Sequence, residues 1–146
     1  MDEYKLVEAT KGDCQLLYRW TNEVEVRRNS FNTNKVSYED HINWFMNKLN
    51  SKDTFIYIFK NKKESIGVIR LEKLECKSML INYSIDSNYR SQGYATKLLQ
   101  LIKIKFKDYT LVGEVKKNNI GSIKAFQKAG YFMKEELEYL VFYSKG

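Results

Sequence analysis

The strongest constraint on the fold is the segment 78–107, where a strand pattern runs through a polar turn into a helix pattern. Residues 78–86, SMLINYSID, carry the β-branched and aromatic side chains typical of a strand. The polar turn ends at Gly93, and apolar residues then recur at the spacing of one helix face. These residues are Ala95, Leu98, Leu99, Ile102 and Phe106. The segment therefore predicts a helix that packs on a sheet.

The rest of the chain alternates between strand and helix patterns. Strands are expected at 5–10, 54–60, 65–74, 109–115 and 136–144. Asp13 is expected to cap a helix that packs through Leu16, Leu17 and Trp20, and Ser37 one that packs through Ile42, Trp44, Phe45 and Leu49. Residues 27–35 look polar and irregular, and a short helix over 121–130 should end at Gly130. The order β-α-α-β-β-β-α-β-α-β predicts a mixed sheet covered by helices.

Composition narrows the class of protein. The 146 residues are 43% hydrophobic, which suits one domain over residues 1–146. No apolar run approaches the roughly 20 residues of a membrane span, and the N-terminus lacks a signal-peptide pattern. Cys14 and Cys76 lack metal-site spacing and His41 is the single histidine, so no metal site is expected. We expect a cytoplasmic protein with reduced cysteines, a monomer or homodimer.

The net charge of +7 is spread along the chain. Dispersed lysine is usually a solvated surface, so the charge alone selects no partner, although it is compatible with a phosphate-bearing small molecule. We expect neither a nucleic acid nor a membrane partner.

The turn before the helix has the properties of an anion site. The first N–H groups of a helix have no partner inside it, and the helix dipole adds partial positive charge there. Gly93 allows a sharp turn and a close approach, and Arg90 can add charge at the entrance. Neither GxxxxGK[ST] nor GxGxxG occurs. Alone, this glycine would favour an ordinary turn between a strand and a helix.

A second motif gives the turn a context. Residues 90–95, RSQGYA, fit the pattern Q/R-x-x-G-x-G/A, and residues 119–131 carry Asn119, Ser122, Lys128, Gly130 and Tyr131 at fixed spacing. Together these motifs, over about the last two-fifths of the chain, resemble the two motifs of the GNAT N-acetyltransferase superfamily. The resemblance implies an α/β (α+β) GNAT fold, with a mixed, mostly antiparallel sheet, splayed central strands and helices on both faces.

The resemblance also implies acetyl-CoA as the acetyl donor. Backbone N–H groups from Ser91 to Thr96 would hold its pyrophosphate. Its pantetheine would lie between the strand ending at Ile85 and the strand ending at Val115. The residues expected to bind it are Ile85, Arg90, Ser91, Gln92, Gly93, Tyr94, Ala95, Thr96, Asn119, Ser122, Phe126 and Lys128.

Acetyl transfer to an amine needs a base for the amine and a proton for the leaving thiolate. Many members of the superfamily place a glutamate in the strand before the turn, but this chain has MLIN at 79–82. Glu114 is the predicted base, acting through water, although an outward-facing strand position would explain it as well. Where many members have a tyrosine acid, this chain has Phe126. Ser122 is the nearest hydroxyl by motif, with Tyr131 or water as alternatives.

The N-terminal part resembles two groups within the superfamily. The pattern W-x-N…V-R…S-F…H-x-x-W-F over residues 20–45 is similar to ribosomal-protein N-terminal acetyltransferases and, more closely, to nucleotide-sugar N-acetyltransferases of the pseudaminic-acid pathway type. The resemblance implies that the acceptor cleft is lined or supported by Asn22, Arg27, Phe31, His41 and Trp44. Trp20 and Trp44 at apolar helix positions are more often core than cleft residues, and His41 near a helix start is more often a packing or capping residue. Arg27 is the strongest candidate for direct contact.

Three functions follow. The first is acetyl transfer to a UDP-linked amino sugar. The second is acetylation of a protein N-terminus, a polyamine or a drug. The third is a non-catalytic acyl-CoA-binding or nucleic-acid-binding module.

Overall fold

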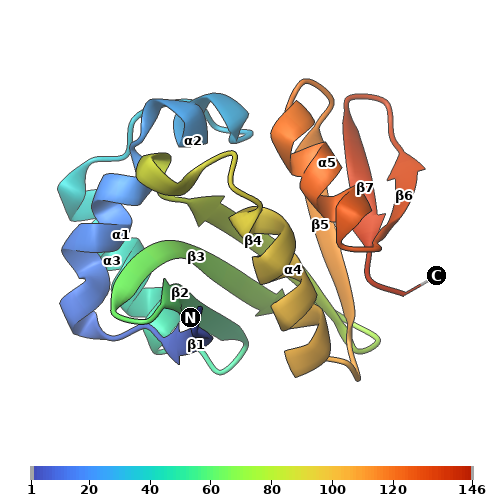
Figure 1. Ribbon diagram of the computed structural model, residues 1–146. Coiled ribbons are helices and arrows are strands. Elements are labelled where there is room, and N and C mark those ends of the chain that lie inside the picture. The colour runs from blue at the N-terminus through green and yellow to red at the C-terminus, as the bar shows by residue number, and fades with distance from the viewer. Residues whose placement is uncertain (1, 146) are drawn as a thin grey trace.

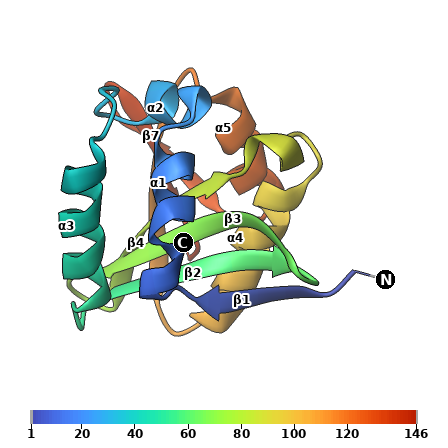
Figure 2. The same cartoon turned by 90° about the vertical axis from the view of Figure 1, so that its left-hand side faces the viewer.

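A seven-stranded sheet forms the centre of the protein (Figures 1 and 2). The computed structural model describes residues 2–145. Along the chain the strands are β1 (Tyr4–Glu8), β2 (Thr54–Asn61), β3 (Glu64–Lys73), β4 (Ser78–Ile85), β5 (Thr110–Lys116), β6 (Phe132–Glu135) and β7 (Tyr139–Tyr143). Their order in the sheet is β1-β2-β3-β4-β5-β7-β6, and within the described residues every pairing is antiparallel except that of β4 with β5. The mixed, mostly antiparallel sheet is confirmed.

Helices cover both faces of this sheet, as predicted. They are α1 (Cys14–Thr21), α2 (Val24–Asn29), α3 (Tyr38–Leu49), α4 (Tyr94–Lys105) and α5 (Ile120–Lys128), with short 3₁₀ turns at Lys11–Asp13 and Ser87–Tyr89. The side chains of β2 alternate between the two faces. Ile56 and Ile58 pack with α1 and α3, whereas Tyr57 and Phe59 belong to the larger core beneath α4 and α5. None of the helices in residues 2–145 is long and apolar enough to cross a bilayer.

Two of the helix ends expected from local signals are present, and one predicted cap is not. Ser37 caps α3, because its hydroxyl accepts a hydrogen bond from the Asp40 N–H at 3.1 Å. Gly130 follows α5 in the left-handed conformation, with φ of 86°, and its N–H donates to the Gln127 carbonyl. Asp13 does stand just before α1, but the prediction that its side chain caps the helix is wrong. Its carboxylate accepts from the N–H of Thr10 at 2.8 Å instead.

Two short elements differ from the sequence prediction. The polar stretch 27–35 was expected to be irregular, yet α2 extends into it as far as Asn29. Strand β6 was not expected, and it pairs with β7 at the edge of the sheet. Neither element contains a buried residue, so neither shows the apolar periodicity on which the prediction rests.

The sheet opens between β4 and β5. These strands pair in parallel only at Ser78 with Thr110, Met79 with Leu111 and Leu80 with Val112. Beyond the third pair they diverge, and the gap between their ribbons is visible in Figure 1. β3 continues to pair with β4 as far as Ile85, and β7 with β5 as far as Lys116. The splayed central strands are therefore present.

Candidate functional site

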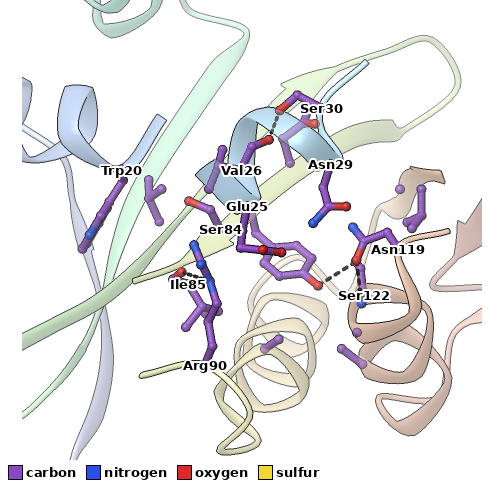
Figure 3. Close-up of a pocket in the computed structure, with 18 of the residues that line it drawn as sticks. Trp20, Glu25, Val26, Asn29, Ser30, Ser84, Ile85, Arg90, Asn119 and Ser122 are labelled. Atoms are coloured by element: carbon purple, nitrogen blue, oxygen red, sulfur yellow. Dashed lines mark hydrogen bonds between the residues drawn. The ribbon is translucent and has the colours of Figure 1, made fainter. Parts of the chain in front are cut away.

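A cleft of about 940 Å³ occupies the opening between β4 and β5 (Figure 3). It is bounded by the diverging ends of the two strands, the N-terminal ends of α4 and α5, and α2. The predicted site residues that line it are Arg27, Phe31, His41, Trp44, Ile85, Arg90, Ser91, Gly93, Tyr94, Ala95, Thr96, Glu114, Asn119, Ser122, Phe126 and Lys128. Asn22 and Gln92 lie outside this lining. Within residues 2–145 no cluster of metal-ligating side chains occurs.

The turn before α4 presents unpaired backbone donors to the cleft. The first hydrogen bond inside the helix runs from the Lys97 N–H to the Gly93 carbonyl, so the N–H groups of residues 94–96 have no partner within the helix. Gly93 has φ of 83° and Ser91 has φ of 61°. A side chain at Gly93 would meet nothing within 4 Å, so the glycine is needed for its conformation. A serine with a positive φ is unusual, because its side chain strains this backbone conformation. Such strain is often retained at ligand sites.

Arg90 is held in place by two contacts. Its Nε donates to the carbonyl of Ile85 at 3.1 Å, and its guanidinium forms an ion pair with Glu23 at 2.8 Å. Glu23 is the N-cap residue of α2. The positive charge at the entrance is therefore partly balanced by a carboxylate, which the sequence did not indicate. Gln92 is exposed and donates to the carbonyl of Asn88 at 3.3 Å.

The start of α5 forms the opposite wall of the cleft. Asn119 caps the helix through its Oδ1, which accepts from the Ser122 N–H at 3.2 Å. The ring of Phe126 lies against β5 at Gly113, where a Cβ would come within 2.5 Å of the ring. Lys128 lines the cleft with an exposed side chain. The second motif therefore places one polar pair and one aromatic ring on this wall.

Tyr83 reaches the same wall from β4, and the sequence did not single it out. Its hydroxyl lies 2.7 Å from Ser122 Oγ, within hydrogen-bonding distance. Burial raises the pKa of Tyr83 to about 12, although the Ser122 hydroxyl acts in the opposite direction. Tyr131, an alternative acid in the sequence prediction, instead donates its hydroxyl to the Leu99 carbonyl inside the core at 3.0 Å.

Glu114 lines the cleft from β5 with an exposed side chain. Neighbouring residues of a strand point to opposite faces, and Gly113 faces Phe126 and α5. Glu114 therefore points to the face that carries α1 and α3. An amine that enters from that face would meet this carboxylate.

Arg27 and Asn22 hold the loop after α2 in place. The Arg27 guanidinium donates to the carbonyls of Thr21, Asn32 and Asn34 and to the hydroxyl of Ser30, at 2.7–3.2 Å. The side chain of Asn22 both donates to and accepts from the backbone of Val36, at 2.8 Å in each case. The sequence favoured direct ligand contact for Arg27, whereas these donors are committed to the chain itself.

The three predicted aromatic residues fall into two groups. His41 is buried, with its Nε2 3.1 Å from the Cys14 carbonyl and its ring stacked on Phe45, and burial lowers its pKa. Phe31 and Trp44 are 60% and 37% exposed. Trp44 was expected among the packing residues of its helix and also at the acceptor cleft; it lines the cleft, so only its expected core position is corrected.

Arg70 accompanies Trp44 at the cleft and was not predicted from the sequence. Its guanidinium lies 4.9 Å from the centre of the indole, and its Nε donates to Glu72 at 2.7 Å. Arg70 lies on β3 directly opposite Asn82 of β4. The alternation of charged and apolar residues in β3 is the sequence pattern that could have indicated Arg70.

Comparisons with known proteins address the fold and the family. The spermidine N-acetyltransferase from Vibrio cholerae, solved with CoA and spermine, is 13% identical and superposes with a TM-score of 0.87 over 96% of this chain and 94% of that chain. The aminoglycoside acetyltransferase AAC(6')-Ib, solved with coenzyme A and kanamycin, is 18% identical, with a TM-score of 0.80 over 95% and 94% of the two chains. RimL, a ribosomal α-N-protein acetyltransferase solved with coenzyme A, is 15% identical, with a TM-score of 0.82 over 96% and 92%.

At these identities the structural likenesses show a shared fold. A search of curated proteins gave no significant match in sequence. The sequence model of the acetyltransferase (GNAT) domain matches residues 4–131, which is most of the chain. The chain therefore belongs to the GNAT acetyltransferase family and is an acyltransferase.

Proposed function

We propose that this protein transfers the acetyl group of acetyl-CoA to a primary amine, as a single domain over residues 1–146. The opening between β4 and β5, with the N-terminus of α4 at its mouth, is the observation that carries the proposal. Three structurally similar acetyltransferases were solved with CoA, which supports acetyl-CoA as the donor here.

The donor would be bound along the cleft. N–H groups of the α4 turn and the positive end of its dipole suit a pyrophosphate. The backbone of β4 beyond Leu80 and that of β5 beyond Val112 no longer pair with each other. Both edges can therefore offer hydrogen bonds to the amides of pantetheine.

The chemistry assigned to this site needs few side chains. Glu114, through a water molecule, takes a proton from the amine as its nitrogen attacks the thioester carbonyl carbon. A backbone N–H of β4 is the donor proposed for the developing oxyanion.

For the acceptor we propose the amino group of a nucleotide-linked amino sugar, in a pathway of the pseudaminic-acid type. Exposed aromatic rings at Trp44 and Phe31 offer surfaces for a nucleobase, and Arg70 beside Trp44 offers a cation for phosphate. Because Arg27 is occupied by the loop after α2, Arg70 is the cation on which this acceptor model depends.

A polycationic amine is the second candidate. Glu25 and Glu114 both line the cleft; Glu25 is paired with Arg28, and the carboxylate of Glu114 would attract an acceptor with several amino groups. Two similar structures were solved with spermine and with kanamycin. A protein N-terminus, the third acceptor class, is suggested by the likeness to RimL.

Acetyl-CoA turnover tests the proposal. Purified protein should release CoA with a UDP-linked 4-amino sugar at a kcat/KM at least tenfold above that with spermidine, kanamycin or an N-terminal peptide. A higher value for spermidine or kanamycin would favour the polycationic acceptor. Binding of acetyl-CoA without CoA release from any amine would contradict catalysis.

A further inference from the structure

The leaving thiolate needs a proton, and the family motif lacks its usual tyrosine in this chain. The usual tyrosine position holds Phe126, whose ring is stacked on Phe142 with 4.8 Å between centroids. The hydroxyl of Tyr131 is committed to the Leu99 carbonyl. Of the motif hydroxyls, that of Ser122 remains at the cleft, and it is hydrogen-bonded to a tyrosine on another element.

Tyr83 extends into the cleft from the splayed part of β4. The pairing of β4 with β5 ends at Leu80, three residues earlier. From there the side chain of Tyr83 reaches Ser122 on α5, with 2.7 Å between their oxygens. Its ring lies edge-on to Phe126, with 6.0 Å between centroids. The Tyr83 hydroxyl therefore lies between β4, which borders the proposed acetyl-CoA site, and α5, which forms the opposite wall of that site.

We propose that Tyr83 is the general acid of this enzyme, an inference that rests on the proposed function. As the amine nitrogen bonds to the carbonyl carbon, the C–S bond breaks and sulfur takes the electron pair. The proton of the Tyr83 hydroxyl passes to sulfur, giving CoA with a free thiol. The phenolate left on Tyr83 is reprotonated from solvent through the Ser122 hydroxyl, while the amine proton leaves through Glu114.

The surroundings of Tyr83 fit this role. Burial raises its pKa to about 12, so the phenol is protonated at physiological pH, and the hydrogen bond from Ser122 acts in the opposite direction and favours release of the proton. The Ser122 hydroxyl can donate to the phenol oxygen, and it stabilises the phenolate in that arrangement. Ser122 is thus a positioning residue for Tyr83 in this scheme.

The acid and the proposed base also lie on opposite faces of the opening. Tyr83 is packed with the core beneath α4 and α5, whereas Glu114 points to the face that carries α1 and α3. An amine that approaches from the Glu114 side would expel the thiolate toward Tyr83. Each proton transfer then has its own side of the sheet.

Tyr83→Phe tests the proposal, because it removes the hydroxyl and keeps the ring. We expect kcat to fall about 100-fold or more. The Kd of acetyl-CoA by calorimetry should stay within about threefold, since a phenyl ring still forms that part of the wall. Tyr109→Phe, at the paired end of β5, is the control and should leave kcat unchanged.

Two outcomes would overturn the role of Tyr83. One is a kcat within about threefold of wild type; the other is a loss confined to acetyl-CoA affinity, which would make Tyr83 a wall residue only. Should Tyr83→Phe fail to fold, Ser122→Ala keeps the tyrosine and removes its partner. It should lower kcat about tenfold, and an unchanged kcat would again overturn the scheme. Wild-type protein that neither binds acetyl-CoA nor releases CoA would instead contradict the proposed function.

Discussion

The carboxylate of Glu23 accepts a hydrogen bond from Arg90 at 2.8 Å and so joins the start of α2 to the turn before α4. Glu23 also accepts from the Ser87 N–H at 3.4 Å, within the same turn. The helix beside the proposed acceptor cleft and the proposed pyrophosphate loop thus share one ion pair. A phosphate at α4 would compete with Glu23 for Arg90 and thereby loosen α2.

Arg90→Ala should weaken acetyl-CoA binding. The change removes a cation and leaves the negative charge of Glu23 unopposed near the pyrophosphate. We expect the Kd to rise about tenfold at low salt, and less at 0.5 M salt, where charges are screened. Titration calorimetry at both salt concentrations measures this. Lys63→Ala, on the β2–β3 turn, removes an equal charge and should change the Kd less than about twofold; equal effects of the two variants would contradict the site.

Glu114→Gln should lower kcat/KM about 100-fold with little effect on acetyl-CoA affinity, because the amide cannot take a proton from the amine. Glu138→Gln, on the turn before β7, is the control. An unchanged kcat/KM in Glu114→Gln would show that Glu114 is merely an outward-facing strand residue.

Trp44→Ala should raise the KM for the acceptor about fivefold or more and leave that for acetyl-CoA unchanged. Trp44 is 37% exposed and stacks with Arg70, so its loss leaves the core largely intact. Leu137→Ala removes a side chain that is 90% exposed, and it should alter neither KM. Thermal unfolding identifies a folding defect. A large loss of stability in Trp44→Ala would show that Trp44 acts as a core residue.

Gly113→Ala should destabilise the protein by about 1–3 kcal/mol. The added Cβ would lie 2.5 Å from Phe126 Cζ, and Phe126 is itself confined by Phe142 and Tyr131. Gly12→Ala is the control, because its Cβ would meet its nearest neighbour at an ordinary 3.6 Å. Urea unfolding measures both free energies. A Gly113→Ala protein as stable as Gly12→Ala would mean that the Phe126 ring can move away from β5.

His41 should make the protein less stable below neutral pH. Burial lowers its folded pKa from the usual 6.5, so the unfolded chain takes up a proton first as the pH falls. Stability is therefore lost as the pH falls below about 6.5, with a limiting slope of about 1.4 kcal/mol per pH unit. His41→Gln keeps a donor for the Cys14 carbonyl but does not titrate. The free energy of unfolding at pH 7 and pH 5 should differ less in this variant than in wild type.

The sequence predicted the elements that have a buried face. Strand β4 and helix α4 alternate or repeat apolar residues over eight and twelve positions, and both lie where expected. Strand β6 spans four residues, all exposed, so no pattern in the chain distinguishes it from a loop. It is a strand because β7 offers it a partner, and pairing of that kind is a tertiary property.

The site was predictable where the backbone makes it. Gly93 and Asn119 act through the conformation of their own segments, and such residues leave local motifs. The partners of long side chains leave none. Arg27 turns back to the carbonyls of its own loop, and Tyr83 meets a serine 39 residues away, which only the folded chain brings into contact.

The early end of the β4–β5 pairing has a consequence for the mechanics of the protein. Three residue pairs join the two sides of the sheet, and beyond them each strand lacks a neighbour on one edge. A ligand with amides along its length would act there as a temporary eighth strand and fasten the two halves together. At a hundredfold excess over its Kd, such a ligand stabilises the fold by about 2.7 kcal/mol. Bound acetyl-CoA would then form part of the sheet until its acetyl group is transferred. CoA could leave afterwards only by breaking the hydrogen bonds that join the two halves.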